Sequence, residues 1–310
     1  MTKKIAVIND LSGFGRCSLT AAISVISAMG IQACPLPTAI LTAQTGYPHY
    51  YLDDYTDKMD IYRQEWQKMG QHFDGIYTGF VASEAQIDQI FHFIDTFYTS
   101  DTFLLVDPVM GDDGIKYDMF TPKLLEKMNA LVGEADIITP NLTELCLLTD
   151  ADYDAIIDIA DTRILIDVIG ELASTLLPPD SDNSNTLDSR QTSKKEKEII
   201  VTGIHCKNEH GQKMMGNLYV SKDTRKLFAF PHVGGSYSGT GDLFASCLAA
   251  GIARGDDIPS TIETAGAFLE AALIDTVKEN IPRNDGINYE QYLSMLLPKQ
   301  EAFTGNSCNL

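Results

Sequence analysis

Residues 238–244 read Ser-Gly-Thr-Gly-Asp-Leu-Phe, a glycine-rich turn that opens a helical pattern. The apolar residues that follow recur at helical spacing, at Leu243, Cys247, Leu248 and Ile252, and they predict a helix over 239–254. The first N–H groups of a helix lack helical partners and lie at the positive end of its dipole, which suits phosphate. Asp242 stands in the first turn, where it could accept a proton from an attacking hydroxyl. The segment is either such a phosphate-binding turn or an ordinary glycine turn whose aspartate stabilises the helix start.

The first half of the chain alternates short apolar runs with amphipathic stretches, a pattern typical of βα units in a parallel sheet. We expect strands at 5–8, 75–79, 103–106 and 137–138, and helices at 17–29, 57–72, 83–98, 121–132 and 141–148. Gly30 stands where a helix C-terminal cap is expected. The predicted fold is a doubly wound α/β sheet, mostly parallel, with helices on both faces and sites at the carboxyl ends of its strands.

The second half contains a change of composition. Residues 178–197 are rich in Pro, Asp, Ser, Asn, Thr and Lys and nearly lack apolar side chains, which predicts a flexible surface insertion that activity does not need. A strand is expected at 199–202, two antiparallel strands over 214–231, and helices at 239–254, 258–278 and near 289–297. We therefore predict one domain over 1–298 and a loose tail over 299–310.

Charge and composition limit the function classes. The 310 residues carry 43 acidic and 23 basic side chains, for a formal charge of −20, so nucleic acid would be repelled over most of the surface. Hydrophobic residues make up 44%, but no apolar run approaches the roughly 20 residues that span a bilayer. The N-terminus lacks the apolar region of a signal peptide. We expect a cytoplasmic protein that binds a small molecule and contacts neither membrane nor nucleic acid.

Two further segments place carboxylates after predicted strands. Residues 107–114 read Asp-Pro-Val-Met-Gly-Asp-Asp-Gly, which suits Mg²⁺ held largely through water, or is a polar turn. Residues 139–144 read Thr-Pro-Asn-Leu-Thr-Glu. Glu144 could join a metal shell and Asn141 could contact phosphate, or the two could form a capping box.

Two common nucleotide-binding motifs are disfavoured. Gly13 and Gly15 could begin a dinucleotide-binding turn, but Ser18 holds the third glycine position, and no acidic residue follows from Met29 through Tyr47. No Gly-Lys-Ser or Gly-Lys-Thr occurs, so the chain has no Walker A sequence.

The segments DPVMGDDG, TPNLTE and GTGDLF, in this order and spacing, resemble the pyridoxal kinase branch of the ribokinase-like superfamily from about Ile5 to Lys278. The resemblance implies an ATP-dependent kinase that phosphorylates a primary hydroxyl of a B6 vitamer, with Mg²⁺, a monovalent cation such as K⁺, and a homodimer. It implies Asp242 as catalytic base, with the anion hole formed by Gly239, Thr240 and Gly241. The implied metal residues are Asp107, Asp112 and Glu144, and the implied ATP contacts are Asn141 and Thr202. The implied acceptor pocket comprises Asp10, Ser12, Thr45, Tyr47 and Phe80.

The first loop departs from that pattern. Typical pyridoxal kinases carry serine where Asp10 stands, and residues 10–15 and 42–44 look more like hydroxymethylpyrimidine kinases. Those enzymes, however, commonly have cysteine in place of Asp242 and lack the carboxylates after DPVM, so a B6 vitamer is favoured. Asp10 could hold a phenolic oxygen, a ring nitrogen or an amine. Sugar or nucleoside kinases rank next, followed by a non-catalytic ATP-binding protein.

Overall fold

The computed structural model describes residues 2–179 and 195–298 and contains a nine-stranded sheet in the order β11-β10-β9-β8-β5-β4-β1-β2-β3. Its strands are β1 (Lys4–Ser12), β2 (Gln32–Leu41), β3 (Leu52–Asp54), β4 (Gly75–Thr78), β5 (Phe103–Val106), β8 (Ile137–Ile138), β9 (Glu198–Lys207), β10 (Lys213–Val220) and β11 (Arg225–Pro231). Six neighbouring strands, from β2 through β9, run parallel, whereas β3, β10 and β11 pair antiparallel. A separate hairpin joins β6 (Gly111–Asp112) to β7 (Ile115–Lys116).

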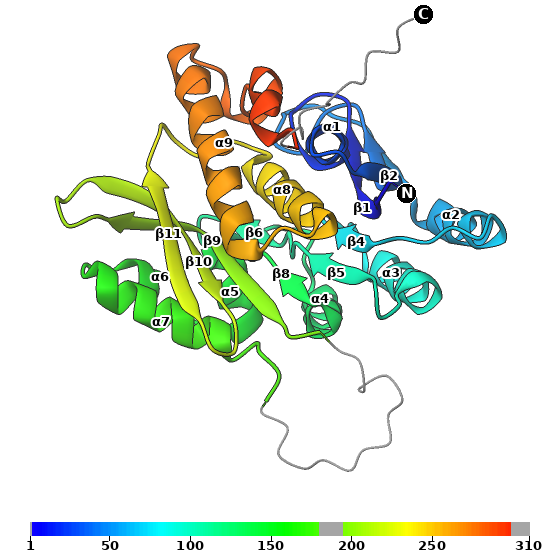
Figure 1. The fold of residues 1–310 in the computed structure, drawn as a ribbon, viewed down its shortest axis with the longest axis horizontal. Helices are drawn as coiled ribbons and strands as arrows, with labels where there is room; N and C mark the ends of the chain where they lie inside the picture. Colours follow the sequence, from blue (N-terminus) through cyan, green and yellow to red (C-terminus); the bar gives the residue numbers. More distant parts are fainter. Residues whose placement is uncertain (1, 180–194, 299–310) are drawn as a thin grey trace, which may run out of the picture.

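Helices cover both faces of the sheet (Figure 1). One face carries α1 (Ser18–Ala28), α8 (Thr240–Arg254) and α9 (Ile258–Lys278). The other carries α2 (Thr56–Lys68), α3 (Glu84–Phe97), α4 (Pro122–Glu134), α5 (Leu142–Thr149), α6 (Tyr153–Ile157) and α7 (Thr162–Ser174). Two 3₁₀ segments, η2 (Arg283–Asp285) and η3 (Glu290–Leu296), follow α9. The predicted doubly wound α/β fold is therefore confirmed.

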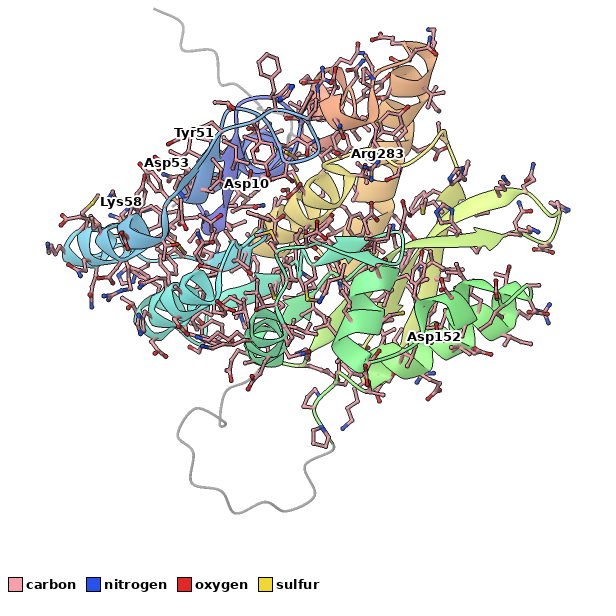
Figure 2. The ribbon with its side chains drawn as sticks, turned by 180° about the vertical axis from the view of Figure 1, so that it is seen from behind. Asp10, Tyr51, Asp53, Lys58, Asp152 and Arg283 are labelled. Atoms are coloured by element: carbon pink, nitrogen blue, oxygen red, sulfur yellow. The ribbon has the colours of Figure 1, made fainter. Side chains whose placement is uncertain are left out.

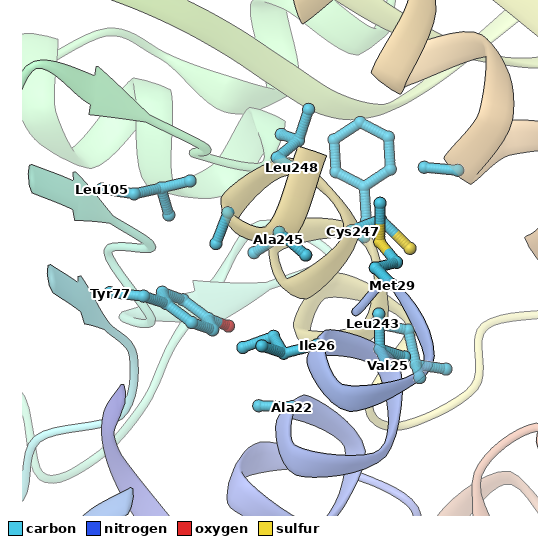
Figure 3. Packing of buried hydrophobic residues seen from close by; sticks show 14 of the residues in the cluster. Ala22, Val25, Ile26, Met29, Tyr77, Leu105, Leu243, Ala245, Cys247 and Leu248 are labelled. Atoms are coloured by element: carbon cyan, nitrogen blue, oxygen red, sulfur yellow. The ribbon is translucent and has the colours of Figure 1, made fainter. Parts of the chain in front are cut away.

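The core next to the functional end of the sheet is built on α8. Buried Leu243, Cys247 and Leu248 of α8 lie with Val25 and Met29 of α1 in one apolar cluster (Figure 3). Tyr77 of β4 and Leu105 of β5 close this cluster from the sheet side. Each such fully buried side chain stabilises the fold by roughly 1.5–3 kcal/mol relative to exposure. The packing fixes the start of α8 against the ends of the central strands.

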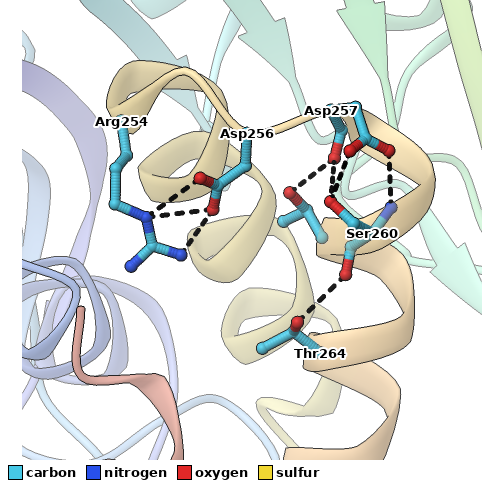
Figure 4. A network of polar contacts seen from close by, with 6 residues as sticks. Arg254, Asp256, Asp257, Ser260 and Thr264 are labelled. Atoms are coloured by element: carbon cyan, nitrogen blue, oxygen red, sulfur yellow. Dashed lines mark hydrogen bonds and ion pairs between the residues drawn. The ribbon is translucent and has the colours of Figure 1, made fainter. Parts of the chain in front are cut away.

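Side chains cap the helices where the chain turns. Asp257 accepts the backbone N–H of Ser260 at 2.9 Å and begins α9, while Arg254 at the end of α8 donates from Nε to Asp256 Oδ2 at 2.9 Å (Figure 4). Gly255 takes a left-handed φ of 97° between them. The short α8–α9 connection is therefore held by its own polar groups.

The strand order reverses at β1, which lies between β2 on one side and β4 on the other. The carboxyl ends of β1, β4, β5, β8 and β9 meet at one edge of the sheet, because these strands are parallel. In doubly wound folds ligands bind in the crevice outside such an edge, at the point of reversal. The residues that follow these strands are therefore the candidates for a site.

Several expectations need correction. The helix expected near 289–297 is the 3₁₀ segment η3, and the helices α6 and α7 lie where no element was expected. Strand β2, over Gln32–Leu41, is not among the expected strands. It tolerates Pro35 and Pro37 because β3 pairs only with Ala39–Leu41, so both prolines lie on the open side of the strand.

The predicted insertion at about 178–197 stays a prediction, although the structure describes a buried residue at its C-terminal end. Residues 180–194, and the tail at 299–310, lie outside the described residues, but Lys197 is only 6% exposed. Its Nζ donates to the carbonyl oxygen of Val132, near the C-terminus of α4. The same carbonyl accepts the Ala135 N–H at 3.2 Å, so the Lys197 ammonium adds a second hydrogen bond, and a cation at a helix C-terminus interacts favourably with the helix dipole.

We predict that Lys197→Ala lowers the free energy of unfolding by about 2 kcal/mol, because it removes a charge-assisted hydrogen bond and leaves the Val132 carbonyl buried without that donor. Urea denaturation would measure the loss. The matched control is Lys195→Ala, which removes an exposed lysine two positions away and should change stability by less than about 0.5 kcal/mol. Equal unfolding curves for the two variants would contradict the assigned role of Lys197.

Candidate active site

The start of α8 lies against the loop that follows β1. Gly239 precedes the helix with a left-handed φ of 82°, and a Cβ atom there would lie 2.0 Å from the carbonyl oxygen of Arg16. This glycine is therefore required by the approach of the first loop rather than by a phosphate. A Cβ atom on Gly241 would meet nothing within 4 Å. The turn thus packs against the first loop at Gly239 and has open space beside Gly241. The first N–H groups of the helix lack intrahelical partners there.

Asn9, which sequence analysis did not select, holds Asp242 in place. Asn9 is fully buried within β1, three residues before the strand ends, and its Nδ2 donates to Asp242 Oδ1 at 3.1 Å. Its Oδ1 accepts the backbone N–H groups of Asp10 and Phe80, each at 2.9 Å. The amide therefore ties the ends of β1 and β4 to the first turn of α8.

The surroundings of Asp242 raise its pKa to about 6, mainly because it is withdrawn from water. The Asp10 carboxylate raises the pKa further, while hydrogen bonds from the Ser18 backbone N–H and the Asn9 amide oppose the shift. Ser18 adopts a left-handed φ of 51°, uncommon for a residue with a side chain. Hydrogen bonds from Asn9 and Ser18 therefore orient Asp242, whose pKa of about 6 lies close to neutral pH.

Two more carboxylates are buried at the same edge. Asp107 follows β5 and accepts a hydrogen bond from Thr139 Oγ1 at 2.9 Å. Burial and the Asp242 charge raise the pKa of Asp107 to about 7. Burial and the Asp107 charge also raise the pKa of Glu144. The carboxylates of Asp242, Asp107 and Glu144 are therefore near enough to disfavour one another's ionised forms.

Asn141 and Glu144 form the capping box that sequence analysis left open. Asn141 Oδ1 accepts the Glu144 N–H at 2.9 Å, and Glu144 Oε2 accepts the Asn141 N–H at 2.8 Å. Glu144 Oε1 also accepts the N–H of Met110 at 3.1 Å, and Asn141 Nδ2 donates to the Gly111 carbonyl at 2.8 Å. Thr202 pairs with Asn141 through an isolated parallel bridge. These residues join β8, β9 and the β6–β7 hairpin.

Asp112 is not gathered with the buried carboxylates but pairs with Arg283, whose Nη2 lies 3.0 Å from Asp112 Oδ2. Burial and Asp113 raise the pKa of Asp112, against the effect of Arg283. Within the described residues, no group of three or more His, Cys, Asp or Glu side chains is arranged as a ready set of metal ligands. A metal role for Asp107, Asp112 and Glu144 stays a prediction.

The residues predicted for an acceptor pocket fall into two groups. Asp10 and Ser12 are buried and joined by a 2.8 Å hydrogen bond, and burial raises the pKa of Asp10. Phe80 shares the Asn9 amide with Asp10 through its backbone. Thr45 is exposed, and Tyr47 donates from its hydroxyl to Asp285 Oδ1 at 2.5 Å, which raises the Tyr47 pKa to about 12. In this structure the Tyr47 hydroxyl contacts Asp285 and not the Asp10 group.

The segment 283–286, for which sequence analysis assigned no role, connects the loops around this edge. The Arg283 carbonyl accepts the Ser238 N–H at 3.1 Å, and the Asn284 carbonyl accepts Gln44 Nε2 at 3.1 Å. Asn284 Nδ2 donates to the Gly46 carbonyl at 2.6 Å. The local signal in this segment was the glycine at 286, which the structure places at a φ of 77°, a value that favours glycine. The segment thus joins the loop at 44–47 to the turn before α8.

We predict that Asp107→Asn raises the melting temperature at pH 8 in buffer with EDTA, because it removes an unfavourable buried charge. The folded pKa of about 7 exceeds the ordinary value of 3.8, so the folded state binds the extra proton and this group's contribution to stability falls as pH rises from about 4 to about 7. The gain should therefore be larger at pH 8 than at pH 5. The exposed Asp118 offers a matched control, Asp118→Asn. Equal gains at the two pH values would contradict the assignment.

The sequence profile of the phosphomethylpyrimidine kinase family matches residues 15–284. A Bacteroides thetaiotaomicron protein named as a putative phosphomethylpyrimidine kinase, in a crystal form with pyridoxal, is 33% identical over 97% of this chain and 98% of its own, with a TM-score of 0.81. Pyridoxal kinase from Lactobacillus plantarum is 25% identical over 96% and 97% of the two chains, with a TM-score of 0.79. A Schizosaccharomyces pombe protein named as a putative pyridoxal kinase is 28% identical over 62% of this chain. The matched region spans half the length of that relative. The resemblance to pyridoxal kinases is confirmed, and the chain belongs to the phosphomethylpyrimidine kinase family of phosphotransferases.

Proposed function

We propose that this protein phosphorylates the primary hydroxymethyl group of a B6 vitamer, with magnesium-bound ATP as donor. The observation that carries the proposal is Asp242, which the Asn9 amide and the Ser18 N–H orient at the open N-terminus of α8. Its pKa of about 6 suits a general base near neutral pH. The family match and the Bacteroides structure with pyridoxal support the reaction class and the acceptor class.

The chain's own groups divide the reaction between them. The acceptor hydroxyl oxygen forms a bond to the γ-phosphorus as the bond from that phosphorus to the leaving ADP oxygen breaks. Asp242 accepts the hydroxyl proton, whose acidity rises as the oxygen attacks. The N–H groups of Gly239, Thr240 and Gly241 donate to the transferring oxygens, and the positive end of the α8 dipole favours their charge.

The carboxylates beyond β5 and β8 fit a hydrated divalent cation. Mg²⁺ usually keeps several waters and binds few protein oxygens directly, so it does not need a closed set of protein ligands. Asp107, Asp112 and Glu144 would hold it, since a cation would relieve the repulsion that raises the pKa values of Asp107 and Glu144. The metal supplies charge neutralisation for the triphosphate.

The nucleotide is assigned to the end of the sheet formed by β8 and β9. Asn141 and Thr202 lie together there through their bridge. The Asn141 side chain is already used at both ends, by the Glu144 N–H and the Gly111 carbonyl. We therefore expect Asn141 to act on ATP mainly by shaping the β6–β7 hairpin, with Thr202 facing the nucleotide. A homodimer and a monovalent cation stay predictions.

A hydroxymethylpyrimidine acceptor is the second candidate, favoured by the family profile and by the first loop. The two acceptors differ at the ring substituents that Asp10 would meet. Asp10 is buried beside Ser12, and burial raises its pKa. Such a carboxyl is suited to a buried polar group of the acceptor, because a mismatched partner leaves it unsatisfied.

We predict turnover with pyridoxal, pyridoxamine or pyridoxine that exceeds turnover with hydroxymethylpyrimidine, measured side by side with magnesium and ATP. Asp10→Ser should change the ratio of kcat/KM between acceptors by about 5- to 100-fold while the apparent affinity for ATP stays nearly constant. Preference for hydroxymethylpyrimidine would decide for the second candidate. If Asp10→Ser leaves every acceptor's kcat/KM unchanged, Asp10 is a structural residue of the loop.

The role of Asp242 is tested by Asp242→Asn, which keeps size and turn geometry but removes the base. We expect kcat to fall by about 10² to 10⁴ while calorimetry shows nearly unchanged ATP affinity. In the wild type, kcat/KM should fall as pH drops through about 6, because the base must be ionised. Asp167→Asn, on an exposed position of α7, serves as control. A folded Asp242→Asn protein with most of its turnover would remove the basis for this mechanism.

A further inference from the structure

Arg283 stands between two parts of the proposed active site. Its Nη2 lies 3.0 Å from Asp112 Oδ2 on the β6–β7 hairpin and 3.4 Å from Ser236 Oγ, just before the turn that opens α8. Its own carbonyl accepts the Ser238 N–H at 3.1 Å. Figure 2 shows Arg283 on the segment that follows α9. The guanidinium therefore bridges the proposed metal side and the proposed phosphate side.

Charge makes this arginine unusual in its surroundings. The site gathers the carboxylates of Asp10, Asp107, Glu144 and Asp242, with the more exposed Asp112 beside them, in a chain of formal charge −20. Among ion pairs between described residues, the Arg283–Asp112 pair is the one that includes a carboxylate of this group. A triphosphate that enters here needs local positive charge beyond the helix dipole.

A phosphate can replace Asp112 as the partner of Arg283 with little loss of protein stability. The two side chains are 54% and 39% exposed, and ion pairs with this exposure contribute little to stability. Both contacts of the guanidinium use Nη2, although an arginine carries five N–H donors in a planar fork that matches phosphate oxygens. A phosphate can therefore compete with Asp112 for this side chain.

We propose that Arg283 is a nucleotide-binding residue that pairs with Asp112 until the nucleotide binds. Asp112 would turn to the magnesium ion that accompanies ATP, and the guanidinium, no longer paired with Asp112, would donate to the γ-phosphate at the Gly239–Gly241 turn. The inference rests on the proposed function for its donor, ATP, but not on the identity of the acceptor. It predicts that Arg283 distinguishes a triphosphate from a diphosphate.

Calorimetric titration with the β,γ-imido analogue of ATP and with ADP, both with magnesium, tests this distinction. Arg283→Gln should weaken binding of the analogue about 10- to 100-fold and binding of ADP less than about threefold. Arg283→Lys should lie between, because it keeps the charge but loses the planar fork. The control is Arg225→Gln, which removes a half-exposed arginine whose Nη1 pairs with Glu171 at 2.6 Å, and it should change neither affinity. Equal weakening of both nucleotides by Arg283→Gln, together with a lower melting temperature, would show a structural role and overturn the proposal.

A second measurement does not depend on Arg283→Gln folding well. In EDTA, Asp112→Asn should strengthen binding of the analogue about two- to fivefold, because Arg283 is no longer engaged. The gain should disappear in the double variant Asp112→Asn/Arg283→Lys if the fork carries it. If the gain survives unchanged in the double variant, it arises only from the lost repulsion between Asp112 and the phosphates. That result would overturn the proposed exchange of Arg283 from Asp112 to the nucleotide. Wild-type protein that binds neither nucleotide would overturn the proposed function along with this inference.

Discussion

The hydrogen bond between Asn9 and Asp242 joins residues 233 positions apart, and the functional edge of the sheet is organised around it. The Asn9 amide is fully buried and uses its oxygen for the backbone of Asp10 and Phe80 and its nitrogen for Asp242. A buried amide with these partners cannot move without leaving polar groups unsatisfied, at about 1–3 kcal/mol each. The ends of β1 and β4 and the start of α8 therefore share one fixed geometry, on which the candidate base depends.

The second constraint is electrostatic. Parallel strands bring their carboxyl ends to one edge, so Asp107 after β5 and Glu144 after β8 approach Asp242. Their pKa values rise because burial and mutual repulsion disfavour the ionised forms. The fold thus holds a group of carboxylates that is unfavourable for stability near neutral pH and whose charge a cation would offset. Such a conflict between stability and local charge is typical of functional sites.

The segment after α9 completes the site from the end of the chain. Its backbone and side chains contact the turn at 236–238, the loop at 44–47 and, through Arg283, the β6–β7 hairpin. These three regions carry the residues assigned to phosphate, acceptor and metal. A single short 3₁₀ segment therefore relates the positions of groups that the central strands alone would leave on separate loops.

The sequence by itself determined the alternation of strands and helices, the doubly wound class and the carboxylates and glycines at the strand ends, because hydrophobic periodicity and turn chemistry are local. It missed α7, although Asp161 caps that helix and Leu165, Ile169 and Ala173 are buried along it. It also ended the polar insertion at Lys197, whose burial depends on the Val132 carbonyl 65 positions away. The tertiary structure alone decided that Asn9 holds Asp242, that Ser18 turns its N–H toward it, and that Arg283 pairs with Asp112. These contacts join segments distant in the chain, so no local pattern encodes them, and they exist only once the parallel strands have brought their carboxyl ends to one edge.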